Sequence, residues 1–173
     1  MHSMKTVFYY TSVYFLDISL EVIKLLKDQV NLHVLIEITN ASKNANIINV
    51  EHLPAGKTMC TPEELLPPDE LLYYKDYFDG VQSVNFVLHH HPTGMSLSTL
   101  KVVRDVAKFM KKIKPDVMHF EGFTLRTVAL LPSILRVKKL VLTIHDAVLH
   151  SGEQTWKSQL PRWLFFRLPV KKT

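Results

Sequence analysis

A histidine and an aspartate, His145 and Asp146, directly follow the apolar run at residues 139–144. A polar pair at the end of a buried strand is unfavourable unless its hydrogen bonds are satisfied by a partner. Imidazole titrates near neutral pH and exchanges hydrogen bonds with hydroxyl groups, so it suits proton transfer or the binding of a hydroxylated substrate. We therefore predict that His145 and Asp146 are catalytic. The structural alternative is that Asp146 caps the following loop and His145 is simply half-buried.

Other polar residues also follow predicted strands, where open α/β sheets bind their ligands. Most of the nine histidines lie at these strand ends. Side chains alternate in direction along an extended chain, so the three consecutive histidines at 89–91 cannot all face one site, and we expect no metal site there. The predicted substrate-binding residues are Thr11, Ser12, Tyr14, His90, Glu121, Gly122, His150, Ser151 and Glu153. His33 and His119 lie inside apolar runs and are expected to be core residues bonded to the backbone.

Strands and helices alternate along the chain. Five apolar runs are typical of buried strands: residues 5–10 (KTVFYY), 32–38 (LHVLIEI), 84–89 (VNFVLH), 117–120 (VMHF) and 139–144 (KLVLTI), with a weaker strand at 47–50. Helical patterns occupy residues 17–27, a short segment after Thr61, residues 69–77, 97–113, 123–135 and 154–168. This alternation predicts a Rossmann-like, doubly wound α/β domain with a parallel sheet.

The longest predicted helix, residues 97–113, has apolar residues at helical spacing. The face expected to pack against the sheet consists of Leu97, Leu100, Val103, Ala107, Met110 and Ile113.

The common phosphate-binding and nucleophile motifs are absent. The loop after the first strand reads Thr11–Ser12–Val13–Tyr14 and has no G-x-G-x-x-G, and neither G-x-x-x-x-G-K-[ST] nor G-x-S-x-G occurs. A dinucleotide-dependent oxidoreductase, a P-loop NTPase and an α/β-hydrolase are therefore poor interpretations. We expect no cofactor.

Composition indicates the number of domains, the cellular location and the kinds of partner. The 173 residues fit one domain, and the single cysteine, Cys60, excludes an internal disulfide and fits a reducing, cytoplasmic location. No apolar run reaches the ~18–20 residues that cross a bilayer, and the N-terminus does not resemble a signal peptide. The net charge of +5 suits anionic partners of any kind. No helix carries an unbroken basic face, so we do not expect nucleic-acid binding.

The C-terminal segment mixes aromatic and basic residues. These are Trp156, Lys157, Arg162, Trp163, Phe165, Phe166, Arg167, Lys171 and Lys172. Such a composition suits peripheral contact with the inner face of a membrane. The alternative is that Trp163, Phe165 and Phe166 pack against protein.

Two motifs in the second half resemble the N-terminal domain of family 4 glycosyltransferases. Residues 114–122 (KPDVMHFEG), a helical segment and residues 141–146 (VLTIHD) are similar to that family's "KPDVIHxHG", Leu- and Ala-rich helix and "xxTxHD", in the same order. Residues 150–153 (HSGE) resemble a tract found after that HD in some bacterial members. The similarity extends to specific motifs over residues 114–153. In the first half of the chain it is limited to the general pattern.

The resemblance implies one half of a GT-B fold, in which two Rossmann-like domains face each other across a cleft. The N-terminal domain binds the acceptor, and the C-terminal domain holds the nucleotide-sugar and a Glu-x7-Glu motif. Transfer retains the anomeric configuration and needs no metal. By resemblance, His145 lies near the donor sugar, Asp146 orients it or contacts the acceptor, and His150 and Glu153 contribute to the acceptor side.

The chain also departs from the family pattern. It lacks the Gly-Gly loop that many relatives carry after the first strand, and Glu121 stands where many carry a second histidine. It contains no Glu-x7-Glu. We therefore interpret residues 1–173 as a single acceptor-side domain that needs a donor domain for sugar transfer to a glycan or lipid-linked acceptor, and expect it to be inactive alone. The alternative is a stand-alone module of the same fold that binds a saccharide or a protein without catalysis.

Overall fold

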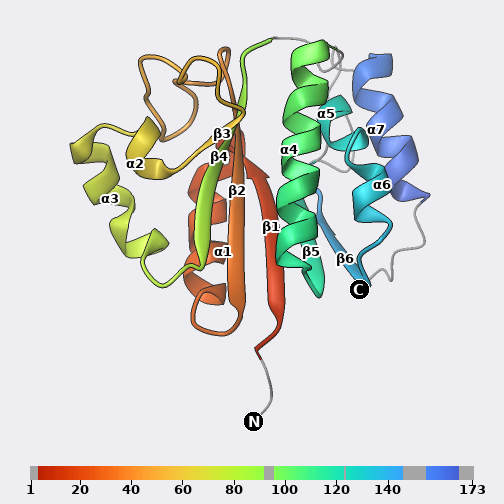
Figure 1. Cartoon of the computed structure of the whole chain (residues 1–173), viewed down its shortest axis with the longest axis horizontal. Coiled ribbons are helices and arrows are strands. Elements are labelled where there is room, and N and C mark those ends of the chain that lie inside the picture. Colours follow the sequence, from red (N-terminus) through yellow and green to blue (C-terminus); the bar gives the residue numbers. More distant parts are fainter. Residues whose placement is uncertain (1–3, 92–95, 123, 146–154, 168–173) are drawn as a thin grey trace.

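The computed structural model describes residues 4–91, 96–122, 124–145 and 155–167. Its centre is a six-stranded sheet with the order β3-β4-β2-β1-β5-β6, and helices cover both faces (Figure 1). The strands are Thr6–Ser12 (β1), Asn31–Thr39 (β2), Met59–Cys60 (β3), Ser83–His89 (β4), Val117–Glu121 (β5) and Lys139–Thr143 (β6). The predicted Rossmann-like, doubly wound α/β architecture is confirmed.

The sheet is parallel except at one edge. Neighbouring strands run parallel from β4 through β2, β1 and β5 to β6, whereas β3 is antiparallel to β4. The prediction of a strand at residues 47–50 is wrong, because these residues form a turn and coil. Ile48 and Val50 are buried in the core, so their apolar character reflects packing rather than strand pairing.

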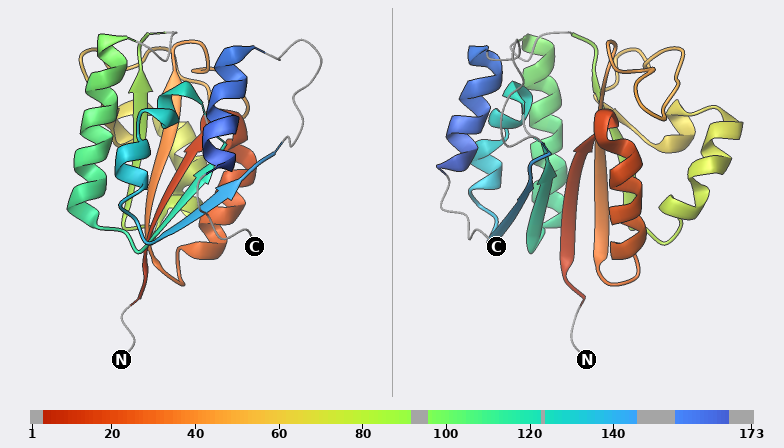
Figure 2. Two further views of the ribbon diagram at one scale, coloured as in Figure 1. Left: turned by 90° about the vertical axis from the view of Figure 1, so that its right-hand side faces the viewer. Right: turned by 180° about the vertical axis from the view of Figure 1, so that it is seen from behind.

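Two hydrophobic cores lie on the two faces of the sheet. One contains buried residues of α1 (Leu16–Leu26), α2 (Pro62–Leu65) and α3 (Pro68–Phe78), and the other contains those of α4 (Leu97–Ile113), α6 (Leu131–Ile134) and α7 (Trp156–Phe166). The two views of Figure 2 show these helices on opposite sides of the strands. A 3-10 turn at Val13–Phe15 joins β1 to α1, and the short helix α5 spans Leu125–Val128.

Two helix predictions need correction. The single helix expected at residues 123–135 is divided into α5 and α6, because Pro132 lacks a backbone N–H and occupies the first turn of a new helix. The face predicted for α4 is rotated: Thr99, Val102, Val106 and Met110 are its buried residues. Leu97 and Leu100, which were expected to pack against the sheet, are 86% and 60% exposed.

The order of the strands reverses at β1. The chain leaves β1 through α1 toward β2 and later returns through α4, on the other face, to β5. The carboxyl ends of β1 and β5 are neighbours, with Tyr10 paired to Phe120. In doubly wound sheets this switch point is where a crevice forms and ligands bind.

Candidate active site

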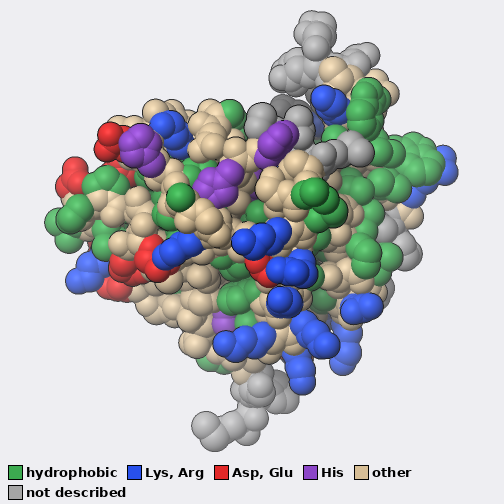
Figure 3. Space-filling model, turned by 45° about the horizontal axis from the view of Figure 1, so that its top comes forward, with side chains coloured by type: hydrophobic (Ala, Val, Ile, Leu, Met, Phe, Trp, Pro, Cys, Tyr) green, Lys and Arg blue, Asp and Glu red, His purple; other side chains and the backbone are tan. Residues whose placement is uncertain are grey.

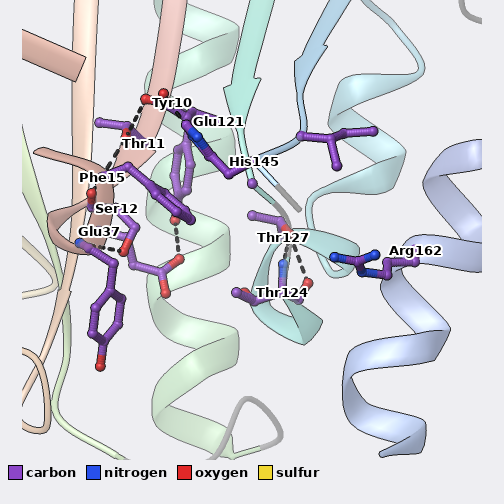
Figure 4. A pocket seen from close by; sticks show the side chains of 13 residues that line it. Tyr10, Thr11, Ser12, Phe15, Glu37, Glu121, Thr124, Thr127, His145 and Arg162 are labelled. Atoms are coloured by element: carbon purple, nitrogen blue, oxygen red, sulfur yellow. Dashed lines mark hydrogen bonds and ion pairs between the residues drawn. The ribbon is translucent and has the colours of Figure 1, made fainter. Parts of the chain in front are cut away.

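A cavity of about 250 Å³ lies at the switch point. Its walls come from the ends of β1, β2 and β5, the residues after β6, and helices α5 and α7 (Figure 4). The lining residues are Tyr10, Thr11, Ser12, Tyr14, Phe15, Glu37, Glu121, Gly122, Thr124, Thr127, Ile144, His145 and Arg162. Two of them, Glu37 and Glu121, are buried carboxylates, and each has its own set of partners.

Glu121 lies on the side of the sheet covered by α1 and is only 4% exposed. Its Oε2 accepts hydrogen bonds from the hydroxyls of Tyr9 and Ser19 and, at 2.9 Å, from Thr11. A buried carboxylate is tolerated when hydrogen-bond donors replace its water shell. Burial and the Glu121 carboxylate raise the pKa of Tyr9 far above its usual range, so the phenol keeps its proton and donates. This cluster fixes Glu121 and leaves Oε1 for another partner.

That partner is His145, whose Nε2 lies 3.0 Å from Glu121 Oε1. The imidazole ring also stacks on Phe15, with 4.1 Å between centroids and 17° between planes. Figure 4 shows Glu121 and Phe15 on two sides of the histidine. Within the described ranges, Nδ1 of His145 has no hydrogen-bond partner. Among the described residues the ring is therefore held through one nitrogen, and His145 lines the cavity.

Glu37 forms a second cluster on the opposite face of the sheet. Tyr10 donates to Oε2 at 2.8 Å and Arg126 donates to Oε1 through Nη1 at 3.1 Å. Nε2 of His89 lies 4.0 Å from Oε2. Burial and the Glu37 carboxylate raise the pKa of Tyr10 well above its usual range. The clusters of Glu37 and Glu121 approach the same cavity from the two faces.

The structure brings six of the predicted site residues together. Thr11, Ser12, Tyr14, Glu121, Gly122 and His145 all line the cavity. Their surroundings differ, since Thr11 is fully buried whereas Tyr14 is 56% exposed. Ser12 accepts a hydrogen bond from the backbone N–H of Tyr14 at 3.4 Å and so begins the 3-10 turn.

Other predicted residues lie elsewhere or cannot be placed. His90 is not part of this cavity: it lines a second one, where its Nε2 lies 2.9 Å from the carbonyl of Lys57. Asp146, His150, Ser151 and Glu153 lie outside the described residues. His33 and His119 bond to hydroxyls of neighbouring strands, Ser83 and Thr143, at 2.8 and 2.7 Å, rather than to the backbone.

Several residues of the site lie outside those predicted from the sequence. Glu37 interrupts an otherwise apolar strand, and an unpaired charge there would be unfavourable, so its position could have indicated a buried partner. Tyr9, Ser19, Phe15, Arg126 and Arg162 had no such signal, because their roles depend on contacts between elements far apart in sequence.

The described residues contain no group of three His, Cys, Asp or Glu side chains that could hold a metal ion. Within the same residues, none of the helices is both long and apolar enough to span a bilayer.

A family model described as "Glycosyl transferase 4-like" matches residues 76–168, more than half of the chain. The chain belongs to this glycosyl transferase 4-like family. The resemblance predicted from the KPDVMHFEG and VLTIHD motifs is confirmed, and the matched region includes β4, β5, β6, Glu121 and His145. No curated protein sequence matches the chain.

A solved structure shares the fold. The chain is similar to a UDP-GlcNAc 2-epimerase from Methanocaldococcus jannaschii, with a TM-score of 0.51, 14% identity, and coverage of 92% of this chain and 36% of the epimerase. A UDP-GlcNAc 2-epimerase from Neisseria meningitidis bound to UDP-GlcNAc gives a TM-score of 0.49 at 14% identity, with 92% and 37% coverage. The chain thus spans little more than a third of the length of these proteins. At this identity, the likeness to the M. jannaschii epimerase shows the fold alone.

Proposed function

We propose that this domain is the acceptor-side half of a GT-B glycosyltransferase that transfers a sugar from a nucleotide-sugar to a glycan or lipid-linked acceptor. One observation carries the proposal: in a family 4-like domain, the switch-point cavity holds a histidine whose Nε2 is fixed by a buried carboxylate and whose Nδ1 has no partner among the described residues. An enzyme gains rate by holding such groups in place before the substrate arrives.

In this reaction the bond between the anomeric carbon and the nucleoside diphosphate breaks, and a bond to the acceptor oxygen forms. The acceptor hydroxyl loses its proton, which the leaving diphosphate accepts. We assign to His145 a hydrogen bond to a sugar hydroxyl beside the anomeric carbon. Asp146 contacts the acceptor in this scheme, together with His150, Ser151 and Glu153. The scheme uses no metal or cofactor and retains the anomeric configuration, as in the family that the chain resembles.

For Glu121 we propose a role other than the substrate binding first predicted for it. Both of its oxygens are engaged by protein groups, and it is almost fully buried. We therefore propose that Glu121 is a positioning residue that acts through His145. Thr11 supports Glu121, while Ser12, Tyr14 and Gly122 form the wall of the cavity.

We further propose that the nucleotide-sugar is bound mainly by a second Rossmann-like domain, so that residues 1–173 alone do not transfer sugar. Support comes from the resemblance, from the missing Glu-x7-Glu and from the 36% of the M. jannaschii epimerase that this domain spans. The reaction would take place in the cytoplasm. Peripheral contact with the inner face of a membrane would bring a lipid-linked acceptor to the site.

The decisive experiment measures turnover of a panel of nucleotide-sugars by the full-length protein and by its His145→Ala variant. Loss of a positioned catalytic group lowers the rate by about 100-fold or more. His52→Ala, which removes an exposed histidine that does not line the cavity, is the matched control and should leave turnover unchanged. Equal activity of wild type and His145→Ala would overturn the assigned role. Saccharide binding without turnover would instead support a binding module.

A further inference from the structure

The outward face of α4 is largely cationic. From Lys101 to the end of this helix, every exposed residue is a lysine or an arginine, namely Lys101, Arg104, Lys108, Lys111 and Lys112. Successive members of this set up to Lys111 are three or four residues apart, so they lie on one side of the helix. The buried residues Val102, Val106 and Met110 lie on the other side and belong to the core beneath α4. The helix therefore has an apolar inner face and a basic outer face.

Acidic groups offset only part of this charge. Asp105 is the one acidic residue in the sequence of α4, and it is less exposed than the cations around it. Its carboxylate accepts a hydrogen bond from Thr58 at 2.9 Å and lies within 4 Å of Arg104 and Lys108. Lys and Arg side chains gather in the lower centre of Figure 3, whereas most of the acidic side chains visible there lie to the left. The outer face of α4 therefore carries a net positive charge.

The same face begins with two leucines. Leu97 and Leu100 precede Lys101 and Arg104 by four residues each, so they lie on the cationic side of the helix. Both leucines are strongly exposed, although an apolar side chain gains free energy by leaving water. Cations beside exposed apolar side chains suit an anionic bilayer, because the cations pair with headgroups while the apolar side chains enter the acyl boundary. A nucleic acid presents phosphates but no hydrocarbon layer for the leucines.

The leucine end of α4 lies at the same end of the sheet as the switch-point cavity. The helix follows β4 and runs back along the sheet, so its first turn lies at the top of Figure 1, where the parallel strands end. The cavity is lined by residues at the carboxyl ends of β1, β2 and β5. Insertion of Leu97 and Leu100 into a membrane would therefore bring this end of the sheet close to the lipid surface.

From these observations we propose that the outer face of α4, from Leu97 to Lys112, is a docking surface for an anionic lipid membrane. The cations bind lipid phosphates, and the two leucines enter the boundary between the headgroups and the acyl chains. The inference deepens the proposed function and rests on it for the lipid-linked acceptor, but it places the contact on α4 rather than on the aromatic C-terminal helix. Vesicle binding itself requires no sugar transfer.

The test is co-sedimentation of the full-length protein with phosphatidylcholine vesicles that contain or lack phosphatidylglycerol. The wild type should sediment only with the anionic vesicles, and less at high salt. Lys101→Gln/Lys111→Gln should weaken this binding about tenfold or more, because each cation near an anionic surface strengthens binding about fivefold. The matched control is Lys24→Gln/Lys75→Gln, which removes two exposed lysines from α1 and α3 on the other side of the sheet and should leave the affinity nearly unchanged.

A second pair of variants tests the leucines at constant charge. Leu97→Ser/Leu100→Ser should weaken sedimentation with anionic vesicles about tenfold, whereas Leu25→Ser/Leu72→Ser, at exposed leucines of α1 and α3, should not.

Three results would overturn the proposal. The first is a wild type that does not sediment with anionic vesicles, and the second is equal losses in the α4 variants and their controls, which would indicate general attraction by a basic protein. The third is unchanged binding of Leu97→Ser/Leu100→Ser together with binding of an RNA oligonucleotide, which would assign the face to a nucleic acid. None of these measurements involves turnover, so vesicle binding by an inactive protein would support the docking surface and leave the failure with the proposed function.

Discussion

Nε2 of His145 lies 3.0 Å from Oε1 of Glu121; Glu121 ends β5, and His145 lies two residues beyond the end of the neighbouring parallel strand β6. The register that pairs Glu121 with Thr143 brings His145, the second residue after β6, within reach of the carboxylate. This pair connects the most specific motif of the sequence to a buried hydroxyl cluster.

We expect Glu121→Gln to lower kcat of the full-length enzyme about tenfold or more while changing KM little. The charge that holds His145 is lost, and a hydrogen bond to a charged group contributes about 1.5–3 kcal/mol. Steady-state kinetics with saturating acceptor would measure the two constants. Glu51→Gln, which removes an exposed carboxylate, is the matched control. A variant that loses stability but keeps the specific activity of its folded fraction would show that Glu121 is only structural.

Gly122→Ala should destabilise the protein more than Gly56→Ala. Both glycines have positive φ, +73° and +72°, so an added Cβ costs about 1 kcal/mol of backbone strain at either position. At Gly122 the new Cβ would also lie 3.0 Å from Phe15 Cε2, whereas nothing lies within 4 Å at Gly56. Since Phe15 stacks on His145, only Gly122→Ala should also reduce activity. Urea denaturation of both variants measures the difference, and equal losses would contradict the contact.

Stability should decrease as the pH falls below about 6.5. Burial lowers the pKa values of His33, His89 and His119 in the folded state. Below the pKa that these histidines have in the unfolded chain, the unfolded state therefore binds more protons than the folded state and is favoured. Urea denaturation at about pH 7.5 and about pH 5.5 measures the loss. It should be smaller in His119→Gln than in wild type or in the surface variant His52→Gln, and an unchanged loss in His119→Gln would exclude His119 as a source.

If the C-terminal helix contacts a membrane, its exposed aromatic residues should determine binding. Trp156 and Trp163 of α7 are 56% and 51% exposed, and apolar side chains cover the right-hand part of the surface in Figure 3, where α7 lies. Phe165 is buried in the core, so the packing alternative holds for that residue. Replacing both tryptophans by alanine should weaken flotation with anionic vesicles about tenfold. Leu72→Ala, at an exposed leucine of α3, is the control, and absence of flotation by the wild type would exclude this contact.

Much of the fold could be predicted because the central strands β1 and β2 are largely buried and the long strands all form clear apolar runs. The strand at 139–144 and the helix at 97–113 lie where they were expected. The exceptions arise from tertiary packing: Ile48 and Val50 are apolar because they enter the core from a loop, and Leu97 and Leu100 remain exposed. Sequence periodicity cannot distinguish these cases from a strand or a packed helix face.

The site was predictable only where polar residues directly follow strands. His145, Glu121 and Thr11 follow or end strands and were found in this way. Ser19, Phe15 and Arg126 lie on helices or turns, and their contribution appears only when the helices dock against the sheet. His90 was chosen over His89 because periodicity alone does not show which of three consecutive histidines turns inward.

Consecutive tyrosines of β1 bond to different carboxylates, Tyr9 to Glu121 and Tyr10 to Glu37, on opposite faces of the sheet. A shift of one residue in the register of β1 would exchange the two faces and disconnect both phenols at once. Insertion or deletion of a single residue in β1 should therefore abolish both clusters together. The alignment of this central strand therefore sets the hydrogen bonding of both Glu37 and Glu121, and neither carboxylate can be repositioned independently of the other.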